Sequence, residues 1–150
     1  MCIRDRTNTG KKVLTAEVYN HHFFVMDNQP TGPDFVVRFP FAPIADRDLK
    51  GIGMIKGNDL TYTREMEAGK QIYAVLTGYG STENDNQFVI ENRKTGAAVR
   101  ARIDRPMDMI RYWSPRTTLC PEPFINLSIK PKQADRWSNH YTFYTVGEGR

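Results

Sequence analysis

The stretch TTLCPEPFINLSI, Thr117–Ile129, places an alternating apolar run directly behind a Pro-Glu-Pro triplet. From Phe124 onward the even-numbered side chains point to one face and the odd-numbered ones, from Ile125, to the other, which is typical of a half-buried strand. The carboxylate of Glu122 is held between two prolines, which fix φ and lack a backbone N–H. The stretch therefore predicts a strand over Phe124–Ile129 with a rigidly positioned glutamate at its entrance.

Short segments rich in β-branched and aromatic residues recur along the rest of the chain, and turn-forming clusters such as DNQPTGPD and GYGSTENDN separate most of them. The predicted strands are Val13–Tyr19, Phe23–Met26, Asp34–Phe39, Leu60–Thr63, Gln71–Thr77, Gln87–Glu91, Ala97–Ile103, Met109–Trp113 and Trp137–Val146. Only residues 41–57 leave room for a short helical turn, and their three glycines and Pro43 oppose a longer helix. The pattern predicts an all-β fold, an antiparallel β-sandwich or part of one.

Composition narrows the class of protein. With 150 residues, 39% of them hydrophobic and 25% charged, the chain has the make-up of one globular domain. No apolar run approaches the length that spans a bilayer, so we expect no membrane partner. Basic residues are scattered among acidic ones rather than clustered on one face, so we expect no nucleic-acid partner. Neither the two cysteines, Cys2 and Cys120, nor the three histidines show a metal-binding spacing, and neither a disulfide nor a metal site is expected.

Two segments carry residues suited to acid–base chemistry. In NHHFF, Asn20–Phe24, adjacent strand residues would face opposite sides, so only one of His21 and His22 can line a given pocket. That histidine is a candidate acid or base, or else a partly exposed residue at a strand end. Partial burial of Glu122 would raise its pKa and make it a better base. The alternative is a charged turn residue between edge strands.

Aromatic residues divide into two predicted groups. Trp137, Tyr141 and Phe143 share parity and are predicted to be core. Trp113 lies beside the turn SPRTT at a strand end, where its face is a candidate platform for the C–H surface of a sugar.

Taken in order, these motifs resemble the aldose 1-epimerase (galactose mutarotase-like) family. The resemblance rests on NHHFF followed by Asp27, Pro30, Gly32 and the segment FPF, then RPMDMIRYWSP with CPEPFI, and finally KPKQADRWSNHYTFY. The family fold is an antiparallel β-sandwich of roughly twice this length. The resemblance therefore implies that residues 7–150 form the C-terminal half of an incomplete sandwich. The first six residues, MCIRDR, are interpreted as a non-native scar.

The resemblance also implies a mechanism that needs no metal and no organic cofactor. His21 would be the general acid on the ring oxygen of a monosaccharide or sugar end, and Glu122, on the opposite side of the ring, the general base on the anomeric hydroxyl. Asn20 would position the sugar or the histidine. Trp113 and Arg116 complete the set of expected substrate-binding residues.

Two alternative functions stay open, together with one expectation about the 150 residues taken alone. The tail FFVM differs from the family pattern and the upstream histidine and arginine are missing from this chain, which favours a non-catalytic carbohydrate-binding or accessory sandwich. A sugar-phosphate epimerase would use Arg105 or Arg116 as a phosphate clamp. The 150 residues alone are expected to be weak or inactive as an enzyme, with self-association through exposed strand edges.

Overall fold

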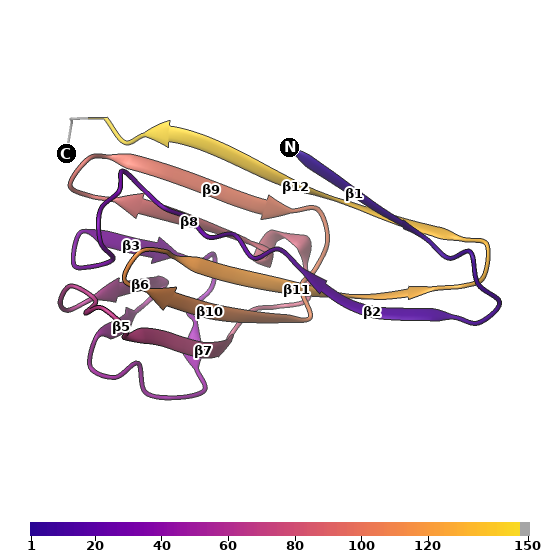
Figure 1. The fold of residues 1–150 in the computed structure, drawn as a ribbon, viewed down its shortest axis with the longest axis horizontal. Helices are drawn as coiled ribbons and strands as arrows, with labels where there is room; N and C mark the ends of the chain where they lie inside the picture. The colour runs from indigo at the N-terminus through magenta and orange to yellow at the C-terminus, as the bar shows by residue number, and fades with distance from the viewer. Residues whose placement is uncertain (148–150) are drawn as a thin grey trace.

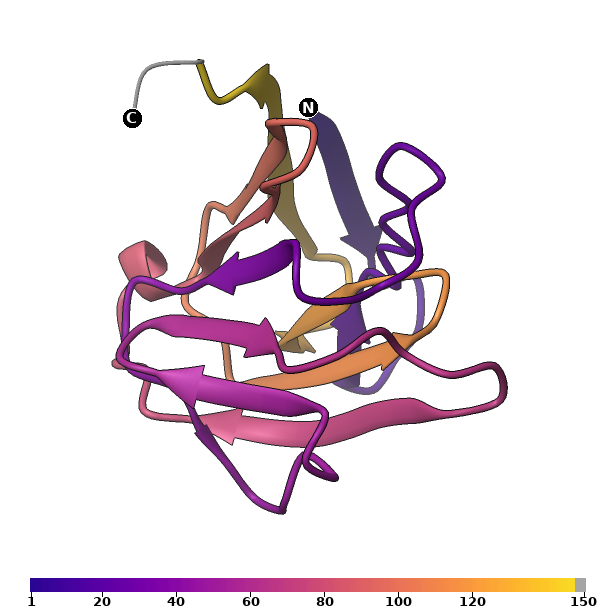
Figure 2. The same cartoon turned by 90° about the vertical axis from the view of Figure 1, so that its left-hand side faces the viewer.

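Two antiparallel sheets face each other in the computed structural model, which describes residues 1–147 (Figures 1 and 2). The larger sheet has seven strands in the order β1 (Cys2–Thr7), β12 (Ala134–Thr145), β9 (Ala97–Ile103), β8 (Gln87–Asn92), β3 (Phe35–Arg38), β6 (Asp59–Tyr62) and β5 (Gly53–Lys56). The smaller sheet has the order β2 (Leu14–Tyr19), β11 (Cys120–Ile129), β10 (Met109–Pro115), β7 (Gln71–Thr77) and β4 (Ile44–Ala45). A single 3-10 turn, Glu83–Asp85, precedes β8. The predicted all-β antiparallel sandwich is confirmed.

Strand β11 shows the alternation that the sequence predicts. Ile125, Leu127 and Ile129 are buried, whereas Asn126 and Ser128 are exposed. The strand begins at Cys120, however, so the Pro-Glu-Pro triplet lies inside it rather than ahead of it. The carboxylate at position 122 is therefore a strand residue of the smaller sheet.

The prolines fit because one edge of β11 is open at this point. Pairing with β2 ends at Phe124, which lies opposite Tyr19. The chain then leaves β2 as irregular coil, and the carbonyl of Pro121 is contacted by the His22 side chain instead of a strand. Along an antiparallel strand the N–H groups alternate between the two neighbours. Pro121 and Pro123 occupy positions directed at the vacated side, where a missing N–H costs no ladder bond.

The hydrophobic interior forms two clusters. The larger fills the space between the two sheets and includes Phe35, Leu60 and Tyr112, all nearly inaccessible to solvent. The smaller joins Ile125, Leu127, Ile129 and Trp137 where β1, β2, β11 and β12 project beyond the other strands (Figure 1).

Parity along β12 predicted the aromatic core only in part. Trp137 is buried in the smaller cluster, and Tyr141 packs half-buried against the larger one. Phe143 is 72% exposed, so its predicted place in the core is wrong. Side-chain parity identifies a common face, but it does not show how far that face is covered.

Two other segments also differ from their predicted structure. Residues 23–26 are not a strand, because Phe23 adopts a positive φ of 43° and only Phe24 makes an isolated bridge, to Leu119. Residues 41–57 hold the short strands β4 and β5 instead of a helical turn. No helix within residues 1–147 is long and apolar enough to cross a membrane.

Candidate functional site

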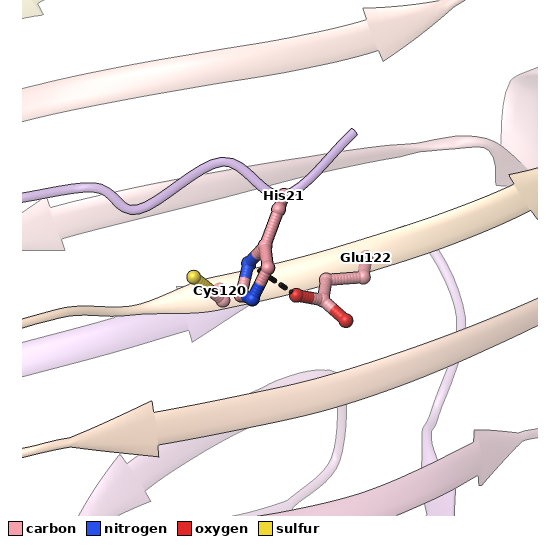
Figure 3. A group of neighbouring side chains, drawn as sticks. All are labelled: His21, Cys120 and Glu122. Carbon is pink, nitrogen blue, oxygen red and sulfur yellow. Dashed lines mark ion pairs between the residues drawn. The ribbon is translucent and has the colours of Figure 1, made fainter. Parts of the chain in front are cut away.

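The structure brings His21 and Glu122 into direct contact (Figure 3). Nδ1 of His21 lies 2.6 Å from Oε1 of Glu122, and the side chains are 38% and 7% exposed, respectively. This contact is an ion pair rather than a hydrogen bond, and Oε1 has no hydrogen-bond donor among residues 1–147. The pair thus consists of a reachable imidazole lying over a buried carboxylate with unused acceptor capacity.

Burial sets the basicity of this carboxylate. Loss of solvent raises the pKa of Glu122, and the charges of His21 and Arg111 oppose that rise. Arg111 lies directly opposite Glu122 in the register of β10 and β11, and its guanidinium lies 4.4 Å from the centre of the Phe124 ring. A carboxylate whose pKa is raised in this way is a stronger base than one in water.

A thiol completes the group of side chains drawn in Figure 3. Cys120 is two residues before Glu122 on β11, so both side chains emerge on the same face of the sheet. The backbone N–H of Phe23 donates to Sγ of Cys120 at 3.1 Å, which ties the coil after β2 to the strand. Burial raises the pKa of the Cys120 thiol to about 11, so it is protonated at neutral pH.

The second histidine belongs to a chain of hydrogen bonds whose direction can be assigned. Nδ1 of His22 lies 2.8 Å from the carbonyl oxygen of Pro121, which only accepts, so Nδ1 carries the proton. In a neutral ring Nε2 is then an acceptor, and the Tyr141 hydroxyl, 3.1 Å away, donates to it. The amide of Asn20 donates to the same hydroxyl oxygen at 3.1 Å. Burial lowers the pKa of His22, which favours this neutral form.

A cavity of about 480 Å³ opens beside these residues, between the coil after β2 and the outer part of β12. Its wall includes Tyr19, Asn20, His21, His22, Tyr141 and Phe143. Both histidines therefore line one cavity, contrary to the expectation from a regular strand, because the segment is coil. Asn20 and His21, two of the predicted site residues, are in the cavity wall.

Aromatic rings surround the histidine of the pair. The ring of Phe23 stacks on His21 at 3.8 Å between centroids, and Trp113 meets His21 edge-on at 5.4 Å. The indole N–H of Trp113 donates to Oε1 of Gln71 at 2.8 Å, which fixes the ring. The predicted platform residue is therefore next to the candidate acid.

Arg116 occupies a different place. Its guanidinium pairs with Glu65 at 2.7 Å and lines a separate cavity of about 220 Å³ with Val25 and Pro30. Arg105, the other candidate phosphate clamp, forms two hydrogen bonds with Asp135. Both arginines already have a carboxylate partner.

Several residues of the site had no assigned role from sequence. Cys120 and Arg111 become recognisable only from strand register, since each shares a face or a rung with Glu122. Tyr141 was predicted to be core, yet its hydroxyl joins the two side chains Asn20 and His22. The tandem histidines were the available signal for this second network.

No family model and no curated protein matches the chain. Among solved structures, the fold resembles the crystal structure of the Slr1438 protein from Synechocystis sp. PCC 6803, with a TM-score of 0.65 and 11% sequence identity. The match covers 96% of this chain and 50% of that one, so the chain spans about half the length of the similar structure. At this identity the similarity establishes the fold.

Proposed function

We propose that the chain is part of an aldose 1-epimerase-like protein that interconverts the anomers of a monosaccharide or sugar end by general acid–base catalysis. The observation that carries the proposal is the contact between His21 and Glu122 beside a cavity of about 480 Å³. The motif resemblance had assigned these two residues as acid and base.

The chemistry requires only proton transfers. Ring opening removes a proton from the anomeric hydroxyl and delivers one to the ring oxygen. Rotation about the C1–C2 bond exposes the other face of the aldehyde, and ring closure reverses both transfers. No redox step or group transfer is involved, so one carboxylate and one imidazole suffice.

The acid and the base were expected on opposite sides of the sugar ring. In the structure they are in contact with each other. This arrangement is compatible with the reaction because the ring oxygen and the anomeric oxygen are bonded to the same carbon. Two groups within 2.6 Å of each other can therefore serve both atoms. The sugar would approach past His21, which lines the cavity and whose side chain is 38% exposed.

The surroundings support these two roles. Burial makes Glu122 a stronger base, and its Oε1 accepts no hydrogen bond within residues 1–147. Asn20 is held by Tyr141 at the cavity wall, where its amide can orient a ligand. Phe23 and Trp113 flank the imidazole and offer aromatic faces or edges to sugar C–H groups.

A second candidate, a non-catalytic carbohydrate-binding sandwich, is favoured by one observation. Glu122 is only 5% exposed, so the imidazole of His21 must swing aside before a sugar hydroxyl reaches the carboxylate. A protein that bound sugar without that movement would not exchange anomers. The sugar-phosphate alternative has less support, because Arg105 and Arg116 are both engaged with carboxylates.

The test is anomer exchange of glucose and galactose followed by exchange NMR, in the 150-residue chain and in the longer parent that the resemblance implies. Glu122→Gln should lower the catalysed rate about 10²–10⁴-fold in the parent while sugar binding persists. Glu17→Gln, an exposed change on β2, is the matched control and should leave the rate unchanged. Sugar binding with no exchange in the unaltered parent would select the binding protein, and an unchanged rate in Glu122→Gln would reject the role of that residue.

A further inference from the structure

The side chains of His21, Cys120 and Glu122 present three different donor atoms to one small volume (Figure 3). A ring nitrogen, the thiol sulfur and a carboxylate oxygen all lie within 4.8 Å of one another. The proposed acid–base reaction uses the nitrogen and the oxygen but gives the Cys120 sulfur no role. The three residues come from two segments that the folding of the sandwich brings together, so their sequence spacing gave no sign of the group.

This donor set matches the preferences of a borderline transition metal. Zinc binds thiolate sulfur at about 2.3 Å, imidazole nitrogen at about 2.0–2.1 Å and carboxylate oxygen at about 2.0–2.2 Å. On a tetrahedral ion these bond lengths place two ligand atoms about 3.3–3.6 Å apart. Nδ1 of His21, now 2.6 Å from Oε1 of Glu122, therefore has to move away from the carboxylate, and the half-exposed His21 side chain allows that movement. Three protein ligands leave a fourth tetrahedral position for water or a substrate atom.

Two features of the surroundings favour a ligand on these atoms. Oε1 of Glu122 is buried and has no hydrogen-bond donor among residues 1–147, a position that a cation would satisfy. The N–H of Phe23 already donates to Sγ of Cys120, and a donated hydrogen bond stabilises a metal-bound thiolate. An ion can reach the group past the exposed His21, whereas Cys120 and Glu122 are buried.

We propose that His21, Cys120 and Glu122 form a binding site for a divalent transition-metal ion of the zinc class, with one coordination position left for water or a ligand atom. Binding releases the thiol proton to solvent and forms bonds from the ion to nitrogen, sulfur and oxygen. The site follows from the geometry alone and does not depend on the epimerase proposal. If that proposal also holds, an occupying ion engages both the acid and the base and should inhibit anomer exchange.

The experiment uses Co²⁺ as a spectroscopic probe of the purified chain, with Zn²⁺ as competitor. We expect one Co²⁺ per chain, a thiolate-to-cobalt charge-transfer absorption, tetrahedral d–d bands, and loss of both on addition of Zn²⁺. Cys120→Ser should abolish the charge-transfer absorption and weaken binding by more than the 10–100-fold typical of an outer-sphere partner. Cys2→Ser removes the exposed thiol and is the matched control, which should leave the spectrum unchanged.

A second variant covers the case in which Cys120→Ser does not fold. Glu122→Gln keeps the thiol, so it should retain the charge-transfer absorption but bind Co²⁺ at least about 10-fold more weakly. Absence of the absorption in the unaltered chain, its loss in Cys2→Ser, or its persistence in folded Cys120→Ser would each overturn the proposal. Anomer exchange plays no part in these readouts, so failure of the epimerase proposal would leave the cobalt result intact.

Discussion

Replacing Tyr141 with phenylalanine tests the hydrogen-bond network behind the cavity. The hydroxyl of Tyr141 accepts from the Asn20 amide and donates to Nε2 of His22, at 3.1 Å in both cases. The substitution removes that oxygen and keeps the ring, which packs half-buried against the larger core cluster. Its effect therefore reports on the two hydrogen bonds rather than on packing.

The expected loss of stability depends on whether Asn20 and His22 find other hydrogen-bond partners after the substitution. Two hydrogen bonds contribute about 0.5–1.5 kcal/mol each. Asn20 is half-buried and can turn to water, but Nε2 of the largely buried His22 loses its donor, which costs about 1–3 kcal/mol. Because these contributions overlap, we expect Tyr141→Phe to lower the free energy of unfolding by about 1.5–3 kcal/mol.

Urea denaturation followed by circular dichroism measures this change, and Tyr144→Phe is the matched control. Tyr144 is on the same strand and is 39% exposed, so loss of its hydroxyl should stay within about 0.5 kcal/mol. Equal stabilities of the two variants would refute the network. Nitrogen-15 NMR gives an independent check, since the assigned directions require the proton of His22 on Nδ1, and a proton on Nε2 would contradict them.

Two further predictions concern the fold. Gly78→Ala should lower the free energy of unfolding by about 3 kcal/mol or more, because the new Cβ would lie 2.3 Å from the Ala42 carbonyl oxygen at a φ of 101°. The control Gly57→Ala, at a φ of 57° in open space, should lower it by only about 1 kcal/mol. Equal losses of the two variants in thermal unfolding would argue against the clash. Arg105 lowers the pKa of Asp135, so the pair stabilises the fold above the unfolded-state pKa of about 4 and stops doing so as pH falls through the lower folded pKa. Asp135→Asn should therefore cost about 0.5–1 kcal/mol at pH 7 and nothing in acid, and a cost independent of pH in urea titrations would show that charge is not the cause.

The fold class was predictable from the sequence because alternation and turn clusters are local signals. The start of β11 at Cys120 was not predictable. Pro121 argues against a strand only where both edges of that strand are paired. Only the tertiary structure shows that β2 turns away after Tyr19 and frees that edge. Phe143 was misplaced for a related reason, because its face of β12 is left uncovered.

The sequence predicted which residues belong to the candidate site, but not how they are arranged in space. The motif order singled out His21 and Glu122, which lie far apart in the chain and are in contact in the structure. Residues 20–22 are coil after β2 ends at Tyr19, and Phe23 follows with a positive φ, so the alternation of a strand does not govern the two histidines. A positive φ is rare for an aromatic residue and leaves no sequence signature, so the shared cavity could not be foreseen.

The two prolines of β11 also limit what can add to the smaller sheet. An incoming strand at the edge vacated by β2 would meet two successive outward positions that have no N–H to donate. Lys and Pro at exposed edges are common protection against the growth of one sheet onto another molecule's sheet. Beyond Asn139, where pairing with β1 ends, β12 has no such protection, and the exposed Phe143 lies in that stretch. These two stretches of edge are therefore unequal in their tendency to aggregate, and the one beside Glu122 is the protected one.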